Sequence, residues 1–391
     1  MKEIRNILVT GAGGFVGKNL VSELENIRTG KEKNSPIGPE IRVKCIEKDT
    51  PEELFKEYCA SADFVFHLAG VNRPEREEDY MEGNAGLTER LLNALREAGN
   101  TPPVMLSSST QAALDNPYGE SKRRAEEAVR EYGRETGAAV FVYRFTNIFG
   151  KWCQPNYNSA VATFCHNIAH DLPIQVRDPK AVLKLIYIDD VVAELINALA
   201  GKERRGGEFC LVEPVFEVSL GRLSELITSF DEGRKALQVP DVGDAFVRRL
   251  YSTYLSYLPE EKVVCPAESH ADKRGSFTEL MKFSGAGQLS VNVIHPGEAK
   301  GEHWHHTKCE KFVVLKGQAL VEMRRVGTYG EGKAFPVHRF ELSGEKPVVI
   351  DILPGFAHRI RNLSDKEELI TLMWANEIFD PARADTYREI V

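Results

Sequence analysis

Three histidines and a glutamate in the C-terminal third of the chain have the residue types and the spacing of a metal site. His303 and His305 are two residues apart, so in a strand both point to one face, away from His306. Glu310 follows after a short turn, and His358 follows a Pro-Gly bend in "LPGFAHRIRN". Because a metal requires convergent donors, we expect His303, His305, Glu310 and His358 to bind one divalent cation.

The donor set leaves the identity of the metal open. Three imidazoles and one carboxylate suit zinc, iron, manganese or nickel, and the general order of affinities does not choose among them. We expect zinc, since the rest of the chain calls for no redox cofactor beyond a nicotinamide. A polar strand end would explain any one of these histidines, but not the complete pattern.

A second set of reactive side chains lies in "SSSTQAALDNPYGESK". Tyr118 and Lys122 are four residues apart, which places both on one face of a helix. A nearby ammonium, with the positive charge of a nicotinamide, would lower the pKa of the tyrosine and suit it to pass a proton during hydride transfer. Ser109 would hydrogen-bond the substrate carbonyl. Tyr-x-x-x-Lys is common by chance, but here it follows a glycine loop and a strand ending in "HLAG".

That glycine loop, "VTGAGGFVG", lies between a buried strand and a helix. Gly11, Gly14 and Gly17 allow a tight turn and a close approach of the backbone to a pyrophosphate. The helix begins at Phe15 and Val16, where free N–H groups and the positive end of the helix dipole favour an anion. We therefore expect a dinucleotide at this turn.

The end of the second strand, "CIEKD", decides which dinucleotide is bound. An acidic residue there binds a ribose 2′-hydroxyl, and a basic residue accommodates a 2′-phosphate. Glu47 and Lys48 are both available. We expect NADPH, held through Lys48, with NADH and Glu47 as the alternative.

Two different patterns of predicted secondary structure follow one another along the chain. Up to about residue 240, buried strands alternate with helices, which predicts a Rossmann-type α/β domain with a doubly wound parallel sheet at 1–245. After about residue 260, strand runs are punctuated by Gly, Pro, Asn and Asp, which predicts an all-β barrel at 263–391. The segment 246–262 reads as a connector. The expected strands are 6–12, 41–46, 62–70, 102–109 and 138–147, and the expected helices are 15–27, 86–99 and 121–137.

The composition narrows the choice of partners and compartment. A net charge of −8 and a pI near 5.8 argue against a nucleic-acid partner. No uncharged apolar stretch approaches the roughly 20 residues of a membrane span. The seven cysteines include no C-x-x-C pair, which argues against a disulfide framework. We therefore expect a cytosolic protein.

The N-terminal half resembles an extended short-chain dehydrogenase/reductase of the nucleotide-sugar-modifying kind, through "TGAGGFVG", "HLAG", "SSS", "NPYGESK", "RFTNIFG" and "YIDDVV". The resemblance implies that Leu68, Ala69 and Gly70 line the cofactor. The interval from the serine to the tyrosine is shorter than in most of that family. Thr110 and Gln111 stand where sugar 4,6-dehydratases carry an acidic pair, which favours simple hydride transfer over dehydration.

The C-terminal part resembles the cupin family. Its first motif is present between Gly297 and Gly317. Five residues separate Gly297 from His303, one separates His303 from His305, four separate His305 from Glu310, and six separate Glu310 from Gly317. "GFAHRIRN" resembles the second motif, with its proline displaced by one position. This resemblance implies that the four proposed ligands lie inside a cupin barrel.

The combination of both halves resembles the CapF-type bifunctional enzymes of capsular polysaccharide synthesis. That resemblance implies a homodimer acting on a UDP-linked keto-amino-sugar on the route to UDP-N-acetyl-L-fucosamine. The cupin domain would epimerise C3 of a UDP-2-acetamido-2,6-dideoxy-4-ketohexose. The reductase domain would then reduce the C4 ketone to give UDP-2-acetamido-2,6-dideoxy-L-talose. Two alternatives stay open: a cupin that only senses a ligand or forms a dimer interface, and a cupin that is an O2-using dioxygenase.

Overall fold

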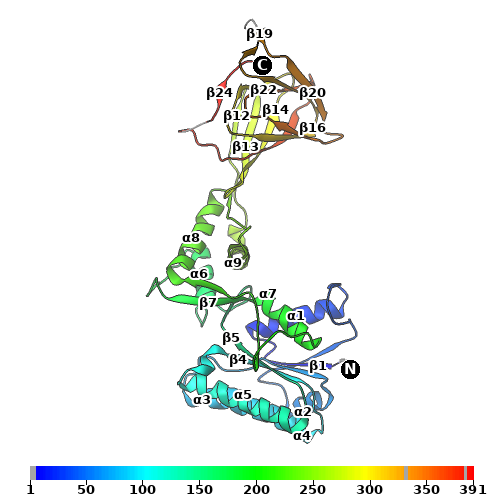
Figure 1. The fold of residues 1–391 in the computed structure, drawn as a ribbon, viewed down its shortest axis with the longest axis vertical. Coiled ribbons are helices and arrows are strands. Elements are labelled where there is room, and N and C mark those ends of the chain that lie inside the picture. Colours follow the sequence, from blue (N-terminus) through cyan, green and yellow to red (C-terminus); the bar gives the residue numbers. More distant parts are fainter. Residues whose placement is uncertain (1–5, 330–332, 383–384) are drawn as a thin grey trace. The chain divides into compact units, whose positions relative to one another are not determined.

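The chain forms two compact units (Figure 1). The first comprises Met1–Ile227 with Arg249–Leu258, and the second comprises Thr228–Arg248 with Pro259–Val391. The predicted division, with a connector at 246–262, stays a prediction. The computed structural model describes residues 6–329, 333–382 and 385–391.

A seven-stranded sheet forms the centre of the first unit, in the order β2-β1-β3-β4-β5-β9-β8. Its strands pair in parallel, apart from the antiparallel edge pair β8 and β9. The order reverses direction at β1, and ligands of such sheets bind at the carboxyl ends of the strands beside that point. The strands are β1 (Asn6–Thr10), β2 (Arg42–Ile46), β3 (Phe64–His67), β4 (Val104–Ser109), β5 (Val140–Phe145), β8 (Arg205–Gly206) and β9 (Phe209–Cys210).

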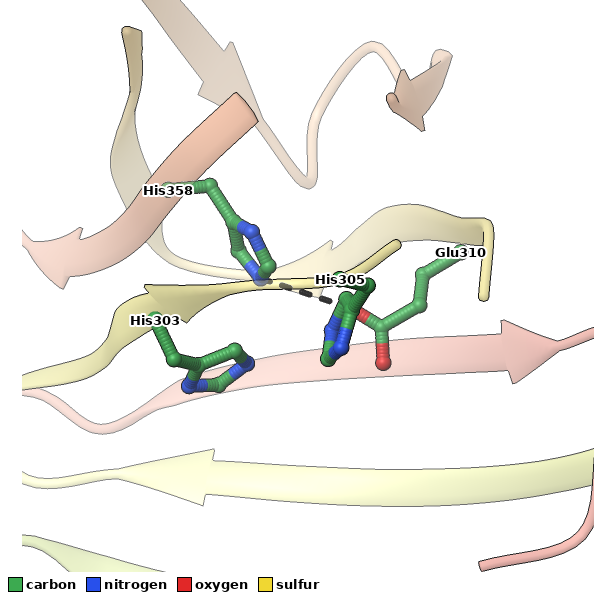
Figure 2. Close-up of side chains that lie close together, drawn as sticks. All are labelled: His303, His305, Glu310 and His358. Atoms are coloured by element: carbon green, nitrogen blue, oxygen red, sulfur yellow. Dashed lines mark ion pairs between the residues drawn. The ribbon is translucent and has the colours of Figure 1, made fainter. Parts of the chain in front are cut away.

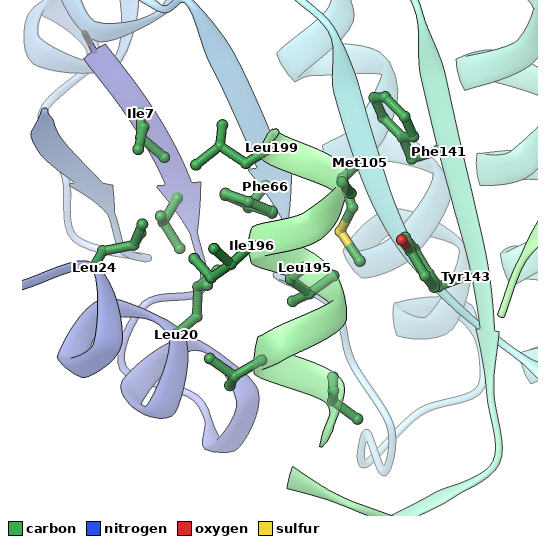
Figure 3. Close-up of a cluster of buried hydrophobic side chains, with 14 of the residues drawn as sticks. Ile7, Leu20, Leu24, Phe66, Met105, Phe141, Tyr143, Leu195, Ile196 and Leu199 are labelled. Atoms are coloured by element: carbon green, nitrogen blue, oxygen red, sulfur yellow. The ribbon is translucent and has the colours of Figure 1, made fainter. Parts of the chain in front are cut away.

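Helices cover both faces of this sheet because its strands are apolar on both sides. Ile7 of β1 packs on one face with Leu20 and Leu195 (Figure 3). The next residue, Leu8, points to the other face and packs with Leu95. One face is covered by α1 (Phe15–Arg28) and α7 (Ile188–Leu199), and the other by α2 (Glu52–Ser61), α4 (Leu87–Glu97) and α5 (Pro117–Thr136).

Shorter elements complete the first unit and lead to the second. A three-stranded sheet has the order β10-β7-β6. Its strands are β6 (Asn147–Phe149), β7 (Val182–Tyr187) and β10 (Phe216–Ser219). The remaining helices are α3 (Glu78–Met81) with a π-helical turn at Glu82–Gly86, a 3-10 turn at Thr110–Ala113, α6 (Ala160–Ala169), α8 (Leu220–Lys235), α9 (Ala245–Leu255) and a 3-10 turn at Glu260–Lys262.

Two large sheets form the second unit, and apart from the short β11 their strands pair antiparallel. One sheet has the order β11-β13-β14-β23-β16-β21, with β12 beside β13, and the other has the order β20-β17-β22-β15-β24. Phe312 of the first sheet and Val321 and Ile360 of the second share one buried cluster, so the sheets face each other. The prediction of a Rossmann-type domain followed by an all-β domain is confirmed.

The strands of the first of these sheets are β11 (Gln238–Val239), β12 (Ser269–Asp272), β13 (Gly275–Phe283), β14 (Gly287–Ile294), β16 (Glu310–Lys316), β21 (Val349–Ile352) and β23 (Leu369–Ala375). Those of the second are β15 (Ala299–Trp304), β17 (Gln318–Arg325), β20 (Val337–Ser343), β22 (Phe356–Asn362) and β24 (Tyr387–Arg388). A separate two-stranded ribbon pairs β18 (Thr328–Tyr329) with β19 (Lys333–Ala334).

All seven cysteines are free thiols. In the part of the chain that the structure describes, every helix is too short or too polar to cross a membrane.

Candidate active sites

The glycine loop after β1 is held in close contact with neighbouring backbone. Gly11 has a φ of +69°, and a Cβ there would lie 2.8 Å from Cα of Ala69. A Cβ on Gly17 would lie 2.1 Å from the Gly11 carbonyl oxygen, so both positions require glycine. Gly14 precedes α1, whose first-turn N–H groups, beginning with Phe15, lack partners within the helix. This geometry fits the predicted pyrophosphate site.

The loop after β3 joins the glycine loop to the predicted catalytic lysine. This loop is Leu68, Ala69 and Gly70, and the Ala69 N–H donates to Thr10 Oγ1 at 3.2 Å. A Cβ on Gly70 would lie 3.1 Å from Nζ of Lys122. Glycine at this position therefore lets the ammonium approach the expected cofactor loop.

A buried histidine at the end of β3 connects β1 to α4. His67 Nδ1 lies 2.7 Å from Thr10 Oγ1, and its Nε2 lies 2.9 Å from Thr88 Oγ1. Burial and the nearby Lys122 ammonium lower the pKa of His67 to about 3, so the imidazole is neutral and ties β1 to α4. Sequence reasoning gave this histidine no role, because one imidazole at the end of an apolar strand carries no distinctive signal.

At the end of β2, the two residues that could choose the cofactor lie in different surroundings. The Glu47 carboxylate accepts a hydrogen bond from the Gly13 N–H of the glycine loop. Lys48 is exposed. The carboxylate therefore has a partner in the loop itself, whereas the lysine points to solvent beside it.

Ser109, Tyr118 and Lys122 come together at the carboxyl end of β4. Helix α5 begins at Pro117, four residues earlier than predicted, because the Asn116 side chain caps it by accepting from the Gly119 N–H at 2.8 Å. Tyr118 therefore lies in the first turn. Lys122 Nζ lies 5.8 Å from the centre of the Tyr118 ring and donates to the Ser107 carbonyl at 3.2 Å.

The protonation of this pair differs from what we expected. Burial raises the pKa of Tyr118, and a hydrogen bond with Ser109 opposes that rise only in part. The Tyr118 hydroxyl also contacts Asn72 Oδ1 at 3.0 Å. Burial lowers the pKa of Lys122 to about 8, which is the ordinary response of an ammonium removed from water. The expected lowering of the Tyr118 pKa is therefore wrong for this structure, since desolvation dominates.

A compact turn explains the short interval between Ser109 and Tyr118. A 3-10 turn at Thr110–Ala113 follows β4 directly, and the Arg123 guanidinium of α5 donates to the carbonyls of Ala112 and Leu114 at 2.9 and 2.6 Å. A Cβ on Gly119 would lie 2.5 Å from the Leu114 carbonyl. The trimmed loop is thus packed tightly against the start of the helix.

The four predicted metal ligands meet inside the second unit, as Figure 2 shows. One potential ligand atom from each of His303, His305, Glu310 and His358 lies within 4.8 Å of all the others. Oε2 of Glu310 is 3.4 Å from Nε2 of His305 and 3.3 Å from Nε2 of His358. The spacing in the sequence therefore identified a real cluster built from β15, β16 and β22 and the turn after β15.

The second polar atoms of His305 and Glu310 already have partners. Nδ1 of His305 contacts the Asp385 carbonyl, and Oε1 of Glu310 lies 3.2 Å from Nζ of Lys308. Nε2 of His305 and Oε2 of Glu310 are buried and have no hydrogen-bond partner. Buried polar atoms without partners are costly, and here they converge with two more imidazoles on one point. The donor set fits a divalent cation.

Burial and proximity shift the pKa values in the direction that a metal site needs. Burial lowers the pKa of His303 to about 4, helped by the neighbouring His358 and His305. Burial alone would raise the pKa of Glu310, but its contacts with His305 and His358 hold that pKa well below the ordinary range. Neutral imidazoles and an ionised carboxylate are the forms that bind a metal.

The quartet opens into a pocket of about 510 Å³. Its polar wall includes the quartet residues His303, Glu310 and His358 together with His270, Asp272, Arg274, Asn292, Lys300, Lys308 and Thr386. Apolar side chains, among them Phe277, Phe312, Met373 and Trp374, form the rest. A cavity of this size with a few convergent polar groups suits a small ligand.

From the sequence, candidate proton carriers for the epimerisation are His306, Lys308, Lys311 and the tyrosines at 251, 254 and 257, and candidate substrate contacts are Arg274 and Glu279. Of these, Lys308 and Arg274 line the pocket. Lys311 pairs with Asp351 at an exposed position. The ring of His306 packs edge-on against Trp304, 4.4 Å between centroids. The tyrosines at 251, 254 and 257 belong to the first unit, and Glu279 pairs with Lys282 at 2.9 Å.

Comparison with known proteins places the chain in a family. Residues 7–210 match the NAD dependent epimerase/dehydratase family, to which the chain therefore belongs. Residues 270–387 match the family described as the polysaccharide biosynthesis C-terminal domain.

Individual relatives match almost the whole chain. The UDP-2-acetamido-2,6-beta-L-arabino-hexul-4-ose reductase of Pseudomonas aeruginosa is 42% identical over 381 residues, 97% of each chain. The crystal structure of the capsular polysaccharide assembling protein CapF from Staphylococcus aureus is 42% identical, with a TM-score of 0.88 over 99% of this chain and 100% of that chain. A structure of CapF with the inhibitor 3-isopropenyl-tropolone is 39% identical, with a TM-score of 0.83 over the same shares. The resemblance to CapF-type enzymes is confirmed.

Proposed function

We propose that the protein is a bifunctional nucleotide-sugar enzyme of capsular polysaccharide synthesis. Its second unit, a cupin barrel, epimerises C3 of a UDP-2-acetamido-2,6-dideoxy-4-ketohexose, and its first unit reduces the C4 ketone to UDP-2-acetamido-2,6-dideoxy-L-talose. The observation that carries this proposal is the presence of two complete sites on one chain. The Ser109, Tyr118 and Lys122 cluster lies beside the glycine loop, and three residues of the four-residue cluster, His303, Glu310 and His358, line a separate pocket.

In the first unit, the side chains are arranged to protonate an oxygen. NADPH, when bound, supplies the hydride that adds to C4. Tyr118 would give its hydroxyl proton to the C4 oxygen, and Ser109 would hold that oxygen by a hydrogen bond. The name of the P. aeruginosa relative, a hexul-4-ose reductase, supports this reaction.

In the second unit, the chemistry needs acidification of a C–H bond. The C4 carbonyl acidifies the proton on C3, so removing that proton and returning it on the opposite face inverts the carbon. His303, His305, Glu310 and His358 would hold a divalent cation, for which we propose zinc, and the cation would supply Lewis-acid polarisation of the carbonyl.

We also propose NADPH as the reductant, in a homodimeric cytosolic enzyme. Because Lys48 is exposed and Glu47 already binds the Gly13 N–H, the lysine is the group left to meet a 2′-phosphate. Lys48→Ala should raise KM for NADPH much more than KM for NADH, measured by cofactor oxidation with the keto-sugar. Equal use of both cofactors by the wild type would instead assign the ribose to Glu47.

Proton NMR of the UDP-keto-sugar in D2O tests the two-step reaction. With the enzyme alone, deuterium should enter at C3. Adding NADPH should then give a C4 alcohol that retains the label. Reduction without exchange would favour a second unit that only senses a ligand or forms a dimer interface, and consumption of O2 would favour a dioxygenase.

A further inference from the structure

Lys300 is a pocket residue that the motif spacing does not reveal. In a regular strand, residues 300 and 303 point to opposite faces. In β15 the pairing with β22 shifts between Gly301 and His303, and Glu302 has a φ of +60°. This bulge turns Lys300 and His303 to the same side, so both line the pocket.

The ammonium of Lys300 is held in place by three oxygens. Nζ donates to Asn292 Oδ1 at 2.7 Å, to the Ser276 carbonyl at 2.9 Å and to the Val293 carbonyl at 3.3 Å. Three acceptors require three N–H donors, which only the protonated form has. Lys300 in this geometry is therefore a cation and has no lone pair with which to act as a base.

Among the described lysines and arginines that line the pocket, Lys300 is the one without a carboxylate in ion-pair distance, and the more distant Asp272 only partly offsets the lowering of its pKa by burial. Arg274 pairs with Asp272 at 2.5 Å, and Lys308 pairs with Glu310 at 3.2 Å. The three partners of Lys300 are neutral oxygens, and in the described part of the chain it forms no ion pair. A partly buried, unpaired charge is costly, so it favours a ligand that brings negative charge into the pocket.

We propose that Lys300 stabilises the negative charge that develops on the C4 oxygen of the substrate when the C3 proton is removed. This inference rests on the proposed epimerase function. The substrate oxygen would replace the Val293 carbonyl, the most distant of the three acceptors. A base passes the C3 proton to solvent while the C3–H electron pair moves into the C3–C4 bond and the carbonyl π electrons move to oxygen. Reprotonation at C3 by a solvent-derived proton reverses both changes.

The test measures deuterium exchange at C3 in three variants of the full-length, metal-loaded enzyme, together with metal content and melting temperature. Lys300→Met removes the charge and keeps the chain length. Asn292→Asp keeps a hydrogen bond to the ammonium but neutralises it with a carboxylate. Lys311→Met, which removes an exposed lysine of the same unit, is the matched control.

We expect Lys300→Met to slow exchange at saturating substrate by at least about 100-fold, as for the loss of one oxyanion donor. Asn292→Asp should slow it by at least about tenfold without lowering the melting temperature, whereas a merely structural lysine would tolerate that change. Lys311→Met should match the wild type. Lys300→Arg, which keeps the charge, should exchange faster than Lys300→Met.

Several results would overturn the proposal. A wild-type exchange rate in Asn292→Asp would show that the charge does not matter, even if Lys300→Met fails to fold. A raised KM with an unchanged maximal rate in Lys300→Met would assign the cation to the diphosphate of the substrate. No exchange in the wild type would remove the epimerase function itself, and the role of Lys300 with it.

Discussion

Tyr118, the proposed proton donor of the reductase, can be tested against its neighbour Tyr80 as a control. The two rings lie 5.5 Å apart, and the Tyr80 hydroxyl donates to the Asn72 carbonyl at 3.2 Å. Tyr118→Phe should lower the rate of NADPH oxidation by about 10²- to 10⁴-fold, the usual contribution of a positioned general acid. Deuterium exchange at C3 should persist, because the second unit is unchanged.

Tyr80→Phe is the matched control, and it should oxidise NADPH at close to the wild-type rate. Both rates are measured by absorbance at saturating keto-sugar. Wild-type oxidation by Tyr118→Phe would exclude this tyrosine as the acid.

Asp385 positions the turn that carries His305, one of the four proposed metal ligands, without being a proposed ligand itself. Its carboxylate accepts from the N–H groups of His306, Thr307 and Lys308 at 2.9, 2.8 and 3.0 Å, and its carbonyl contacts Nδ1 of His305. These N–H groups hold the pKa of Asp385 far below its usual range, against the opposing effect of burial. The turn and the orientation of the His305 ring therefore depend on this one side chain and its backbone.

Asp385→Asn should weaken metal binding by about 10- to 100-fold, because an amide N–H₂ cannot accept from all of these donors. Titration of the metal-free protein against a chromophoric chelator measures the affinity. Asp365→Asn, at an exposed site of the same unit, should bind as tightly as the wild type. Equal affinities in both variants would mean that the turn holds its shape unaided.

The four-residue cluster proposed to bind a metal could be found from sequence, whereas Lys300 and Asp385 could not. The ligands lie at fixed intervals within two motifs, and a strand period of two already brings two of them together. Lys300 reaches the pocket through a bulge, and Asp385 reaches His305 from 80 positions away along the chain. Neither effect leaves a local pattern, because both depend on pairing between distant segments.

At the scale of elements, the strand-to-helix turn after β1 is under tight steric control. A Cβ on Gly17 would lie 2.1 Å from the Gly11 carbonyl oxygen and 2.7 Å from Cα of Ala12. Both atoms belong to the backbone, so the whole glycine loop would have to move. Gly17→Ala should therefore weaken NADPH binding by at least about tenfold, since misplaced N–H donors lose their hydrogen bonds to phosphate.

Gly38→Ala is the control for that change, because nothing lies within 4 Å of a Cβ at that position. Calorimetric titration with NADPH measures both affinities. If Gly17→Ala binds as tightly as Gly38→Ala, the cofactor does not depend on this turn.

Strand and helix alternation predicted strands β1 to β5 and helices α1, α4 and α5 of the first unit, but it missed α2, α6 and α7 and misplaced several element ends. Helix α5 starts earlier than its apolar period suggests, because Asn116 and Pro117 form a polar cap that does not contribute to that period. The pKa of Tyr118 could not be predicted either. Its direction depends on how deeply α5 buries the ring, and burial is a property of the folded unit.

At the scale of the whole molecule, each unit has a hydrophobic core of its own, so damage to one site should stay within its unit. A metal that binds only the folded state stabilises that state by mass action, by about 2.7 kcal/mol at a free concentration 100 times Kd. His305→Ala removes a buried ligand and should both lose metal and lower one melting transition. NADPH binding by the first unit should be unaffected.

His306→Ala is the control that removes an imidazole next to the proposed site without removing a proposed ligand. Its ring lies outside the quartet, stacked edge-on 4.9 Å from Tyr387, so this variant should keep its metal and both melting transitions. Elemental analysis and scanning calorimetry of both variants check these outcomes. A wild-type metal content in His305→Ala would exclude His305 as a ligand. Retained metal with lost C3 exchange would instead make that imidazole an acid–base partner, because its buried Nε2 would then face the substrate rather than a cation.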